Sequence, residues 1–147
     1  MILISHRGNI EGPNTDRENS TDYIEEALKL GFDVEIDVWC NKDIWYLGHD
    51  SPKYKIKFSY LKNQKFWCHA KNIEALERMT SCSDIHSFWH QEDDVTLTSR
   101  NFLWTYPGKP LTSNSICVKP ELACETPKNV LGICSDYINR WRKNEEK

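Results

Sequence analysis

The sequence changes its pattern near the middle of the chain, and this change limits the folds that it can form. In the first half, strand patterns alternate with helix patterns, at 2–5 (strand), 19–31 (helix), 33–39 (strand), 65–71 (strand) and 72–79 (helix). Such alternation is typical of a parallel sheet. In the second half, short extended runs follow one another, and the turn-rich segments between them leave little room for helices.

The extended runs would number about eight if all of them belonged to one sheet, and this number favours a barrel. A standard (β/α)8 barrel takes about 250 residues, whereas this chain has 147. We therefore expect an α/β fold, a minimal (β/α)8 TIM-type barrel in which several of the later helices are missing or replaced by loops. Residues 1–147 are expected to form a single domain, because the length suits one core and no low-complexity linker divides it.

The composition argues against several kinds of partner. The net charge of −3 provides no basic footprint for nucleic acid or for an anionic membrane. No window reaches the roughly 20 apolar residues of a membrane helix, and the first residues have no signal-peptide pattern. Cys68, Cys117 and Cys134 lie in short apolar runs, and the chain has no CxxC pair, which indicates reduced thiols. We therefore predict a cytoplasmic protein.

Polar side chains gather where the predicted strands of the first half end. Glu35 and Asp37 are two residues apart, so both carboxylates leave the same face of their strand. Such a pair fits a hard cation, Mg²⁺ or Ca²⁺, because two adjacent carboxylates otherwise repel each other. The same spacing puts His69 and Lys71 on one face, and the remaining members of this group are His6, Arg7 and His49. In parallel α/β architectures, active sites are assembled at these strand ends.

These residue types together suit the cleavage of a phosphodiester. Two histidines can act as base and acid near neutral pH. A metal, an arginine and a lysine can neutralise the charge that develops on a phosphoryl group. Each motif taken alone has a plainer explanation, a hydrogen-bonded core histidine or a solvated carboxylate, but several motifs in one order favour a functional site.

Four of these motifs resemble those of a known family. HRG (6–8), EN (18–19), ExD (35–37) and HD (49–50), in this order and at these spacings, resemble the motifs of the glycerophosphodiester phosphodiesterase family. That family belongs to the phospholipase-C-like phosphodiesterases, which have a barrel fold. The resemblance covers about the first half of the chain. The closing GICSDY (132–137) is also similar to the last strand of that family, which typically ends in a Thr-Asp or Ser-Asp pair.

The resemblance implies a role for each matching residue. His6 and His49 would be the catalytic acid–base pair. Phosphate would be bound by Arg7 and Lys71, and the divalent metal, Mg²⁺ or Ca²⁺, by Glu35, Asp37 and His69. His69 stands where the family has a third metal-binding carboxylate. An imidazole is a poorer partner for Ca²⁺ than a carboxylate. The alternatives are that the site takes Mg²⁺ or a transition metal, that it binds metal weakly, or that it recruits Glu18, Glu92 or Glu121.

The implied substrate is a small-molecule phosphodiester of glycerol or a sugar, and the implied reaction is hydrolysis. One alternative is a lyase-like enzyme that releases a cyclic phosphate. Another is a non-catalytic protein that binds a phosphate ligand, although binding alone would not need both His6 and His49. A homodimer is a further hypothesis, because apolar strand backs without helices would otherwise face water.

Overall fold

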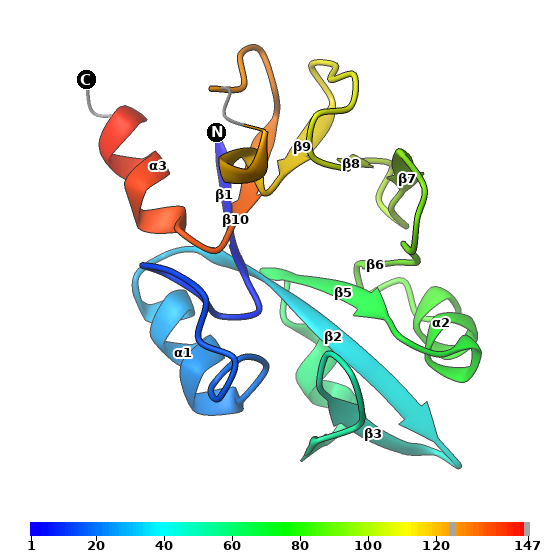
Figure 1. Ribbon diagram of the computed structural model, residues 1–147. Coiled ribbons are helices and arrows are strands. Elements are labelled where there is room, and N and C mark those ends of the chain that lie inside the picture. Colours follow the sequence, from blue (N-terminus) through cyan, green and yellow to red (C-terminus); the bar gives the residue numbers. More distant parts are fainter. Residues whose placement is uncertain (124–125, 146–147) are drawn as a thin grey trace.

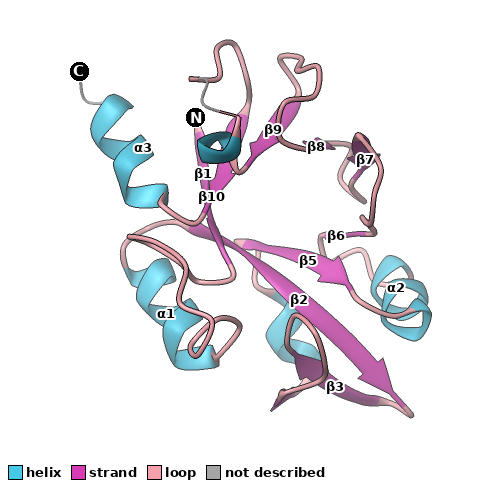
Figure 2. Cartoon of the chain, in the orientation of Figure 1, coloured by secondary structure: helices cyan, strands magenta, loops and turns pink. Residues whose placement is uncertain are grey.

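The computed structural model describes residues 1–123 and 126–145, which form one mixed sheet of ten strands. The sheet curls, and α-helices lie outside it (Figures 1 and 2). The strands are β1 (Ile2–His6), β2 (Asp33–Asn41), β3 (Ile44–Leu47), β4 (Tyr54–Ile56), β5 (Phe66–Ala70), β6 (Ser87–Phe88), β7 (Val95–Leu97), β8 (Leu103–Thr105), β9 (Ser115–Val118) and β10 (Gly132–Ser135). The helices are α1 (Thr21–Lys29), α2 (Ile73–Thr80) and α3 (Ile138–Glu145), with short 3-10 helices η1 (Phe58–Lys62) and η2 (Pro120–Leu122).

Parallel strands form the body of the sheet, in the order β8-β9-β10-β1-β2-β5-β6. The β3–β4 hairpin extends β2 in antiparallel pairing, and β7 pairs antiparallel with β8 at the far end. Within the described residues, no strand ladder joins β6 to β7. The amide of Ser99 donates to the carbonyl oxygen of Ser87 (2.8 Å) across this gap, and the Thr96 hydroxyl donates to that of Trp89 (2.8 Å).

The expected (β/α)8 TIM-type barrel is therefore wrong, and the structure is a strand-rich, curled half-barrel. In the described chain only α1 and α2 lie on crossovers between parallel strands, from β1 to β2 and from β5 to β6. The loop 106–114 between β8 and β9 is shorter than the ten to twelve residues, roughly, that a crossover with a helix takes. The segment 119–131 between β9 and β10 begins with η2 instead of an α-helix.

The two predicted helices of the first half are confirmed, and local signals explain both. Ser20 caps α1 by accepting a hydrogen bond from the Tyr23 amide (3.4 Å), and Asn72 caps α2 by accepting one from the Ala75 amide (3.1 Å). Gly31 follows α1 with a φ of +90°, a conformation that favours glycine. The strand β4 and the helix α3 were not predicted.

Alternate residues of the strands face two different apolar layers. On β2, Val34, Ile36 and Val38 face outward into a core that α1 and α2 cover. Glu35 and Asp37 leave the opposite face, as their spacing predicts. The interior layer below them consists largely of aliphatic and aromatic side chains, namely Ile4, Trp67, Phe88, Trp104, Ile116, Val118 and Cys134. The polar side chains therefore lie next to an apolar interior layer. No described helix has both the length and the apolar character that crossing a membrane requires.

Candidate active site

A cavity of about 380 Å³ opens at the carboxyl ends of the parallel strands. Six of the seven predicted site residues line it, namely His6, Arg7, Glu35, His49, His69 and Lys71. The seventh, Asp37, is fully buried and contacts three of the others. The structure thus brings together all the side chains that the sequence analysis selected. They come from the carboxyl ends of β1 and β5 and the residues just after them, from the first five residues of β2, and from the turn after β3.

The turn after β1 explains why the first strand ends in His-Arg-Gly. Arg7 has a φ of +57° and Gly8 a φ of +92°, and the amide of Asn9 donates to the His6 carbonyl oxygen (2.9 Å) to close the turn. A Cβ at Gly8 would lie 2.8 Å from Cδ1 of Tyr23, so only glycine fits against α1 here. The tight turn leaves the side chains of His6 and Arg7 at the cavity.

Arg7 is the electrostatic centre of the site. Its Nε lies 3.2 Å from Oδ2 of Asp37, and its Nη1 donates to Oε2 of Glu18 (3.2 Å). Burial alone would lower the pKa of Arg7, but the charges of Asp37, Glu35 and Glu18 raise it. Glu18 also accepts a hydrogen bond from Asn9 (2.9 Å). Glu18 therefore holds the arginine in place and is not one of the clustered metal-ligand candidates.

Contacts with Arg7 and Asp37 orient the ring of His49. Nη2 of Arg7 lies 3.3 Å from Nε2 of His49, and because a guanidinium only donates, Nε2 is the acceptor. The proton is then on Nδ1, which faces Oδ2 of Asp37 at 3.5 Å. The preceding Gly48 has a φ of +155°, and a Cβ there would lie 2.0 Å from the Ser51 carbonyl oxygen. The His49 side chain is 39 % exposed, so the cavity and solvent can both reach it.

His6 is oriented by a residue from the other end of the chain. Its Nδ1 lies 2.6 Å from Oδ1 of Asp136, which also accepts a hydrogen bond from Asn9 (2.8 Å) and pairs through Oδ2 with Nζ of Lys119 (3.1 Å). Burial alone would raise the pKa of Asp136, but the contacts with His6, Asn9 and Lys119 lower it. An ionised carboxylate accepts only, so Nδ1 of His6 carries the proton. Nε2 is left on the cavity side, 3.7 Å from Oε2 of Glu35.

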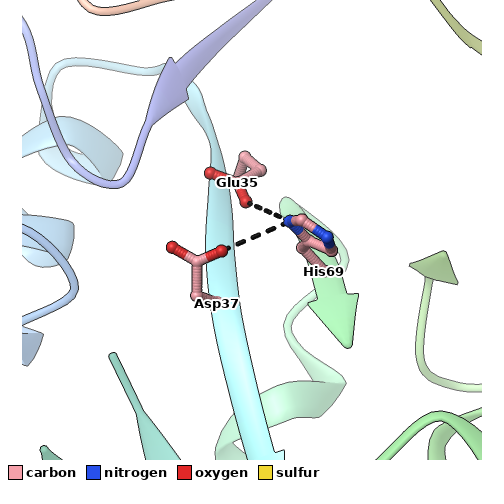
Figure 3. Close-up of side chains that lie close together, drawn as sticks. All are labelled: Glu35, Asp37 and His69. Carbon is pink, nitrogen blue, oxygen red and sulfur yellow. Dashed lines mark ion pairs between the residues drawn. The ribbon is translucent and has the colours of Figure 1, made fainter. Parts of the chain in front are cut away.

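Two buried carboxylates on β2 and an imidazole on the neighbouring strand β5 converge (Figure 3). Nδ1 of His69 lies 3.3 Å from Oδ1 of Asp37 and 3.6 Å from Oε1 of Glu35. Asp37 is 0 % exposed and Glu35 is 2 % exposed. Oδ1 of Asp37 and Oε2 of Glu35 accept no hydrogen bond, although both atoms are buried. Buried, unpaired carboxylate oxygens are costly, so this cluster needs a cation or a proton.

The charges around Asp37 and His69 shift their pKa values in opposite directions. Burial alone would raise the pKa of Asp37, but its contacts with His49 and His69 and the charge of Arg7 hold it well below the usual value. Burial alone would lower the pKa of His69, but the carboxylates of Asp37 and Glu35 raise it to about 9. Asn19 positions Asp37 further, since its side chain donates to Oδ2 (2.8 Å) and accepts from the Asp37 amide (2.9 Å).

The donor set of this cluster fits a divalent cation. Carboxylate oxygens and a neutral imidazole nitrogen are common ligands, and the described ligand atoms of Glu35, Asp37 and His69 lie within 4.8 Å of one another. The alternative third ligands are not brought to it. Glu121 instead accepts hydrogen bonds from the Ser135 hydroxyl (2.9 Å) and the Asp136 amide (3.1 Å). Glu92 is exposed and does not line the cavity.

The far wall of the cavity is made by residues that the sequence analysis did not select. Lys119 and Asp136 directly follow β9 and β10, so the strand-end rule applied to the first half would have found both. An apolar surface lies beside them, formed by Trp104, Tyr106, Pro107, Val118 and Leu122. The cavity therefore has a charged side from the first half of the chain and a largely apolar side from the second half.

Comparisons with known proteins assign no family to this chain. Neither family models, nor curated proteins, nor solved structures gave a match. The resemblance to glycerophosphodiester phosphodiesterases stays a prediction that rests on the four motifs. The function is therefore argued from the side chains at the cavity.

Proposed function

We propose that this protein is a metal-dependent phosphodiester hydrolase of the glycerophosphodiester phosphodiesterase type, which cleaves a glycerol- or sugar-linked phosphodiester. One observation carries the proposal. Two histidines, a phosphate-binding arginine and lysine, and two buried carboxylates with unpaired oxygens converge on a single cavity. A structural role would explain any one of these features, but it would not explain why they share one cavity.

Arg7 and Lys71 bind the phosphate in this proposal. Both line the cavity, and Lys119 adds a third positive charge on the opposite wall. Nη2 of Arg7 contacts His49 in the free protein. A phosphate oxygen is a better partner for the guanidinium than a neutral imidazole, so a bound substrate would draw Nη2 away. Nε2 of His49 would then be free to take or give a proton, which couples substrate binding to catalysis.

Glu35, Asp37 and His69 hold the divalent metal. When bound, the metal supplies positive charge that stabilises the negative charge developing on the phosphoryl oxygens. The two carboxylates meet the geometric requirement because Asn19 and Arg7 fix Asp37, and the β2 backbone fixes Glu35 beside it.

His6 and His49 transfer the protons. Asp136 keeps the proton of His6 on Nδ1, so Nε2 is the atom that faces the cavity. One histidine removes the proton of the nucleophile, a neighbouring hydroxyl of the substrate or a water, and the other protonates the departing oxygen. The apolar wall at Trp104 and Tyr106 receives the carbon skeleton of the alcohol, since aromatic faces pack well against the C–H groups of a sugar or glycerol.

We also propose that the protein acts in the cytoplasm. The cysteines among the described residues are free thiols, at Cys40, Cys68, Cys82, Cys117 and Cys134. Burial raises the pKa of Cys117 to about 11, which keeps this thiol protonated and unreactive. The homodimer stays a prediction, and light scattering of the purified protein would test it.

Hydrolysis assays test the proposed function directly. Bis(p-nitrophenyl) phosphate and glycerophosphodiesters would be supplied with Mg²⁺, Ca²⁺, Mn²⁺ or EDTA. We expect metal-dependent turnover, and we expect His6→Ala and His49→Ala each to reduce kcat by about 10²- to 10⁴-fold, the usual contribution of an acid or a base. His86→Gln is the matched control, because His86 is buried away from the cavity and bonds to Thr98 (2.7 Å).

Two outcomes would replace the proposal with another function. Phosphodiester binding that needs Arg7, without turnover under any metal, would indicate a phosphate-ligand-binding protein. Turnover that stops at a cyclic phosphate, seen by phosphorus NMR of the products, would indicate the lyase-like reaction.

A further inference from the structure

We infer that His69 makes this metal site selective for a first-row transition-metal dication, such as Mn²⁺, Co²⁺ or Zn²⁺, over Ca²⁺ and Mg²⁺. The inference rests on the proposed function for its setting, because it specifies the cofactor of the same site. The inference goes beyond the proposed function, because a metal-dependent phosphodiesterase could equally use a site with oxygen ligands alone.

The ring of His69 is held with one nitrogen directed at the carboxylates. Its Nε2 lies 2.8 Å from the carbonyl oxygen of His90, and because a carbonyl only accepts, Nε2 carries the ring proton. The ring also stacks on Phe88, with centroids 5.0 Å apart and planes 15° apart. When the ring is neutral, as metal binding requires, Nδ1 is an acceptor with a fixed direction. A metal-binding histidine typically has this arrangement, with its other N–H bonded to a carbonyl or carboxylate.

A cation or a proton is needed between these three side chains. In the neutral tautomer, the lone pair of Nδ1 faces Oδ1 of Asp37 at 3.3 Å and Oε1 of Glu35 at 3.6 Å. Oδ1 of Asp37, which faces Nδ1 of His69, has no hydrogen bond in a buried environment. Two donors at about 2.1 Å from one small dication lie about 3.0 Å apart in an octahedron and about 3.4 Å apart in a tetrahedron. The two separations from Nδ1 are close to these values, and the ligand atoms of all three side chains lie within 4.8 Å of one another, so the cluster has the dimensions of a site for a small dication.

The donor types then decide which dication binds best. Ca²⁺ and Mg²⁺ prefer oxygen ligands, whereas imidazole nitrogen suits Mn²⁺, Co²⁺ and Zn²⁺ progressively better. A nitrogen in place of a third carboxylate also leaves one negative charge fewer, which weakens the site most for ions held by charge alone. The competing occupant is a proton on Nδ1 of His69, which would pair with both carboxylates and exclude the metal.

Metal-binding measurements on the full chain test the inference without an activity assay. After treatment with EDTA and its removal, calorimetric titration with Mn²⁺, Co²⁺, Zn²⁺, Mg²⁺ and Ca²⁺ gives each Kd, and Co²⁺ visible absorption reports nitrogen ligation. We expect wild type to bind the transition metals at least about tenfold more tightly than Ca²⁺, and we expect His69→Glu and His69→Gln to reduce this ratio by about tenfold or more. His86→Gln should keep the wild-type ratio. Nitrogen NMR should show Zn²⁺ shifting Nδ1 of His69 while Nε2 stays protonated.

Each outcome separates this inference from the proposed function. Equal ratios in wild type and both His69 variants would overturn the inference and leave a metal-dependent enzyme with an oxygen site. Binding in His69→Glu but not in wild type would overturn it in favour of the proton as the resident cation. No binding of any metal to wild type or His69→Glu, both folded by circular dichroism, would overturn the inference and the metal role in the proposed function together.

Discussion

The two halves of this molecule differ in how they build their share of one cavity. The first half, through α2, has strands of up to nine residues, and α1 and α2 cover its outer face. The second half up to β10 has strands of two to four residues joined mainly by loops. The first half supplies most of the ionisable groups of the site. The second half supplies the apolar wall, together with Lys119 and Asp136.

One sheet can therefore combine strands that helices cover with strands that are joined mainly by loops. The outer core under α1 and α2 is the larger one, with fifteen buried apolar side chains against seven in the interior layer. The interior layer that the second half completes is smaller, and the buried His86 lies against its Trp67. We therefore expect the first half to determine global stability, and the second half to adjust the site and respond to pH. Three predictions test this contrast, from the largest expected effect to the smallest.

Truncation of a core isoleucine should separate the two halves most clearly. Ile36 and Ile116 are both 0 % exposed, one in each core. Ile→Ala at buried sites costs about 2–5 kcal/mol of unfolding free energy. We expect the loss of unfolding free energy in Ile36→Ala to lie near the upper end of this range, because α1 and α2 pack over Ile36. We expect the loss in Ile116→Ala to lie near the lower end, because nearby loops can relax into the space.

Urea unfolding measures both free energies under identical conditions. The control is Ile73→Ala, because Ile73 is 73 % exposed and its truncation should change stability by less than about 0.5 kcal/mol. A larger loss in Ile116→Ala than in Ile36→Ala would contradict the assignment of global stability to the first half.

Asp136 should affect the chemistry only through His6, as a positioning residue. In Asp136→Asn, the charge that holds the proton on Nδ1 of His6 is lost, and Lys119 loses its partner. We expect kcat to fall by about tenfold to a hundredfold with little change in KM, because the imidazole is misoriented while the phosphate ligands stay in place. The pH–rate profile should shift as well.

A matched control for Asp136→Asn is Asp94→Asn, which removes an exposed carboxylate of the same half that pairs with Lys109. Its kcat and its pH–rate profile should equal those of wild type. An unchanged pH–rate profile in Asp136→Asn would show that Asp136 contributes only to stability.

His86 should make the second half sensitive to mild acid. Burial, with a smaller contribution from the charge of Arg100, lowers the pKa of His86 to about 4, below the value of about 6.5 for an unfolded chain. Between these values the unfolded state binds more protons, so the free energy of unfolding rises with pH across this window and is lost as pH falls from 6.5 towards 4. In His86→Gln, the free energy of unfolding should change less with pH across this window.

Unfolding titrations at several pH values between 4 and 7.5 would measure this slope for wild type and His86→Gln. Hydrogen exchange at pH 5 should lose protection first in β6, β7 and β8, which surround His86 and its partner Thr98. Identical slopes for the two proteins would assign the acid sensitivity to other groups.

Local patterns in the sequence predicted a large part of the site. The period of two residues along a strand puts Glu35 and Asp37 on one face, whatever the rest of the fold does. The caps Ser20 and Asn72 start helices through hydrogen bonds to residues three positions away. The expectation that active sites form at the carboxyl ends of parallel strands then grouped the polar residues of the first half at one edge. Such signals depend on neighbours in the chain, and a sequence contains them directly.

Longer-range features could be decided only by the tertiary structure. The pairing of β1 with β10 brings Asp136 to His6 across 130 positions, and no local pattern specifies that contact. The tautomer of His69 depends on the carbonyl oxygen of His90, which the short strand β6 positions. Whether the strands close into a barrel depends on crossovers and core packing summed over the whole chain. The sequence by itself therefore determined which polar side chains were expected to share one site, because that depends on local spacing, whereas the packing of distant strands decided their partners, their protons and the open, half-barrel form of the sheet.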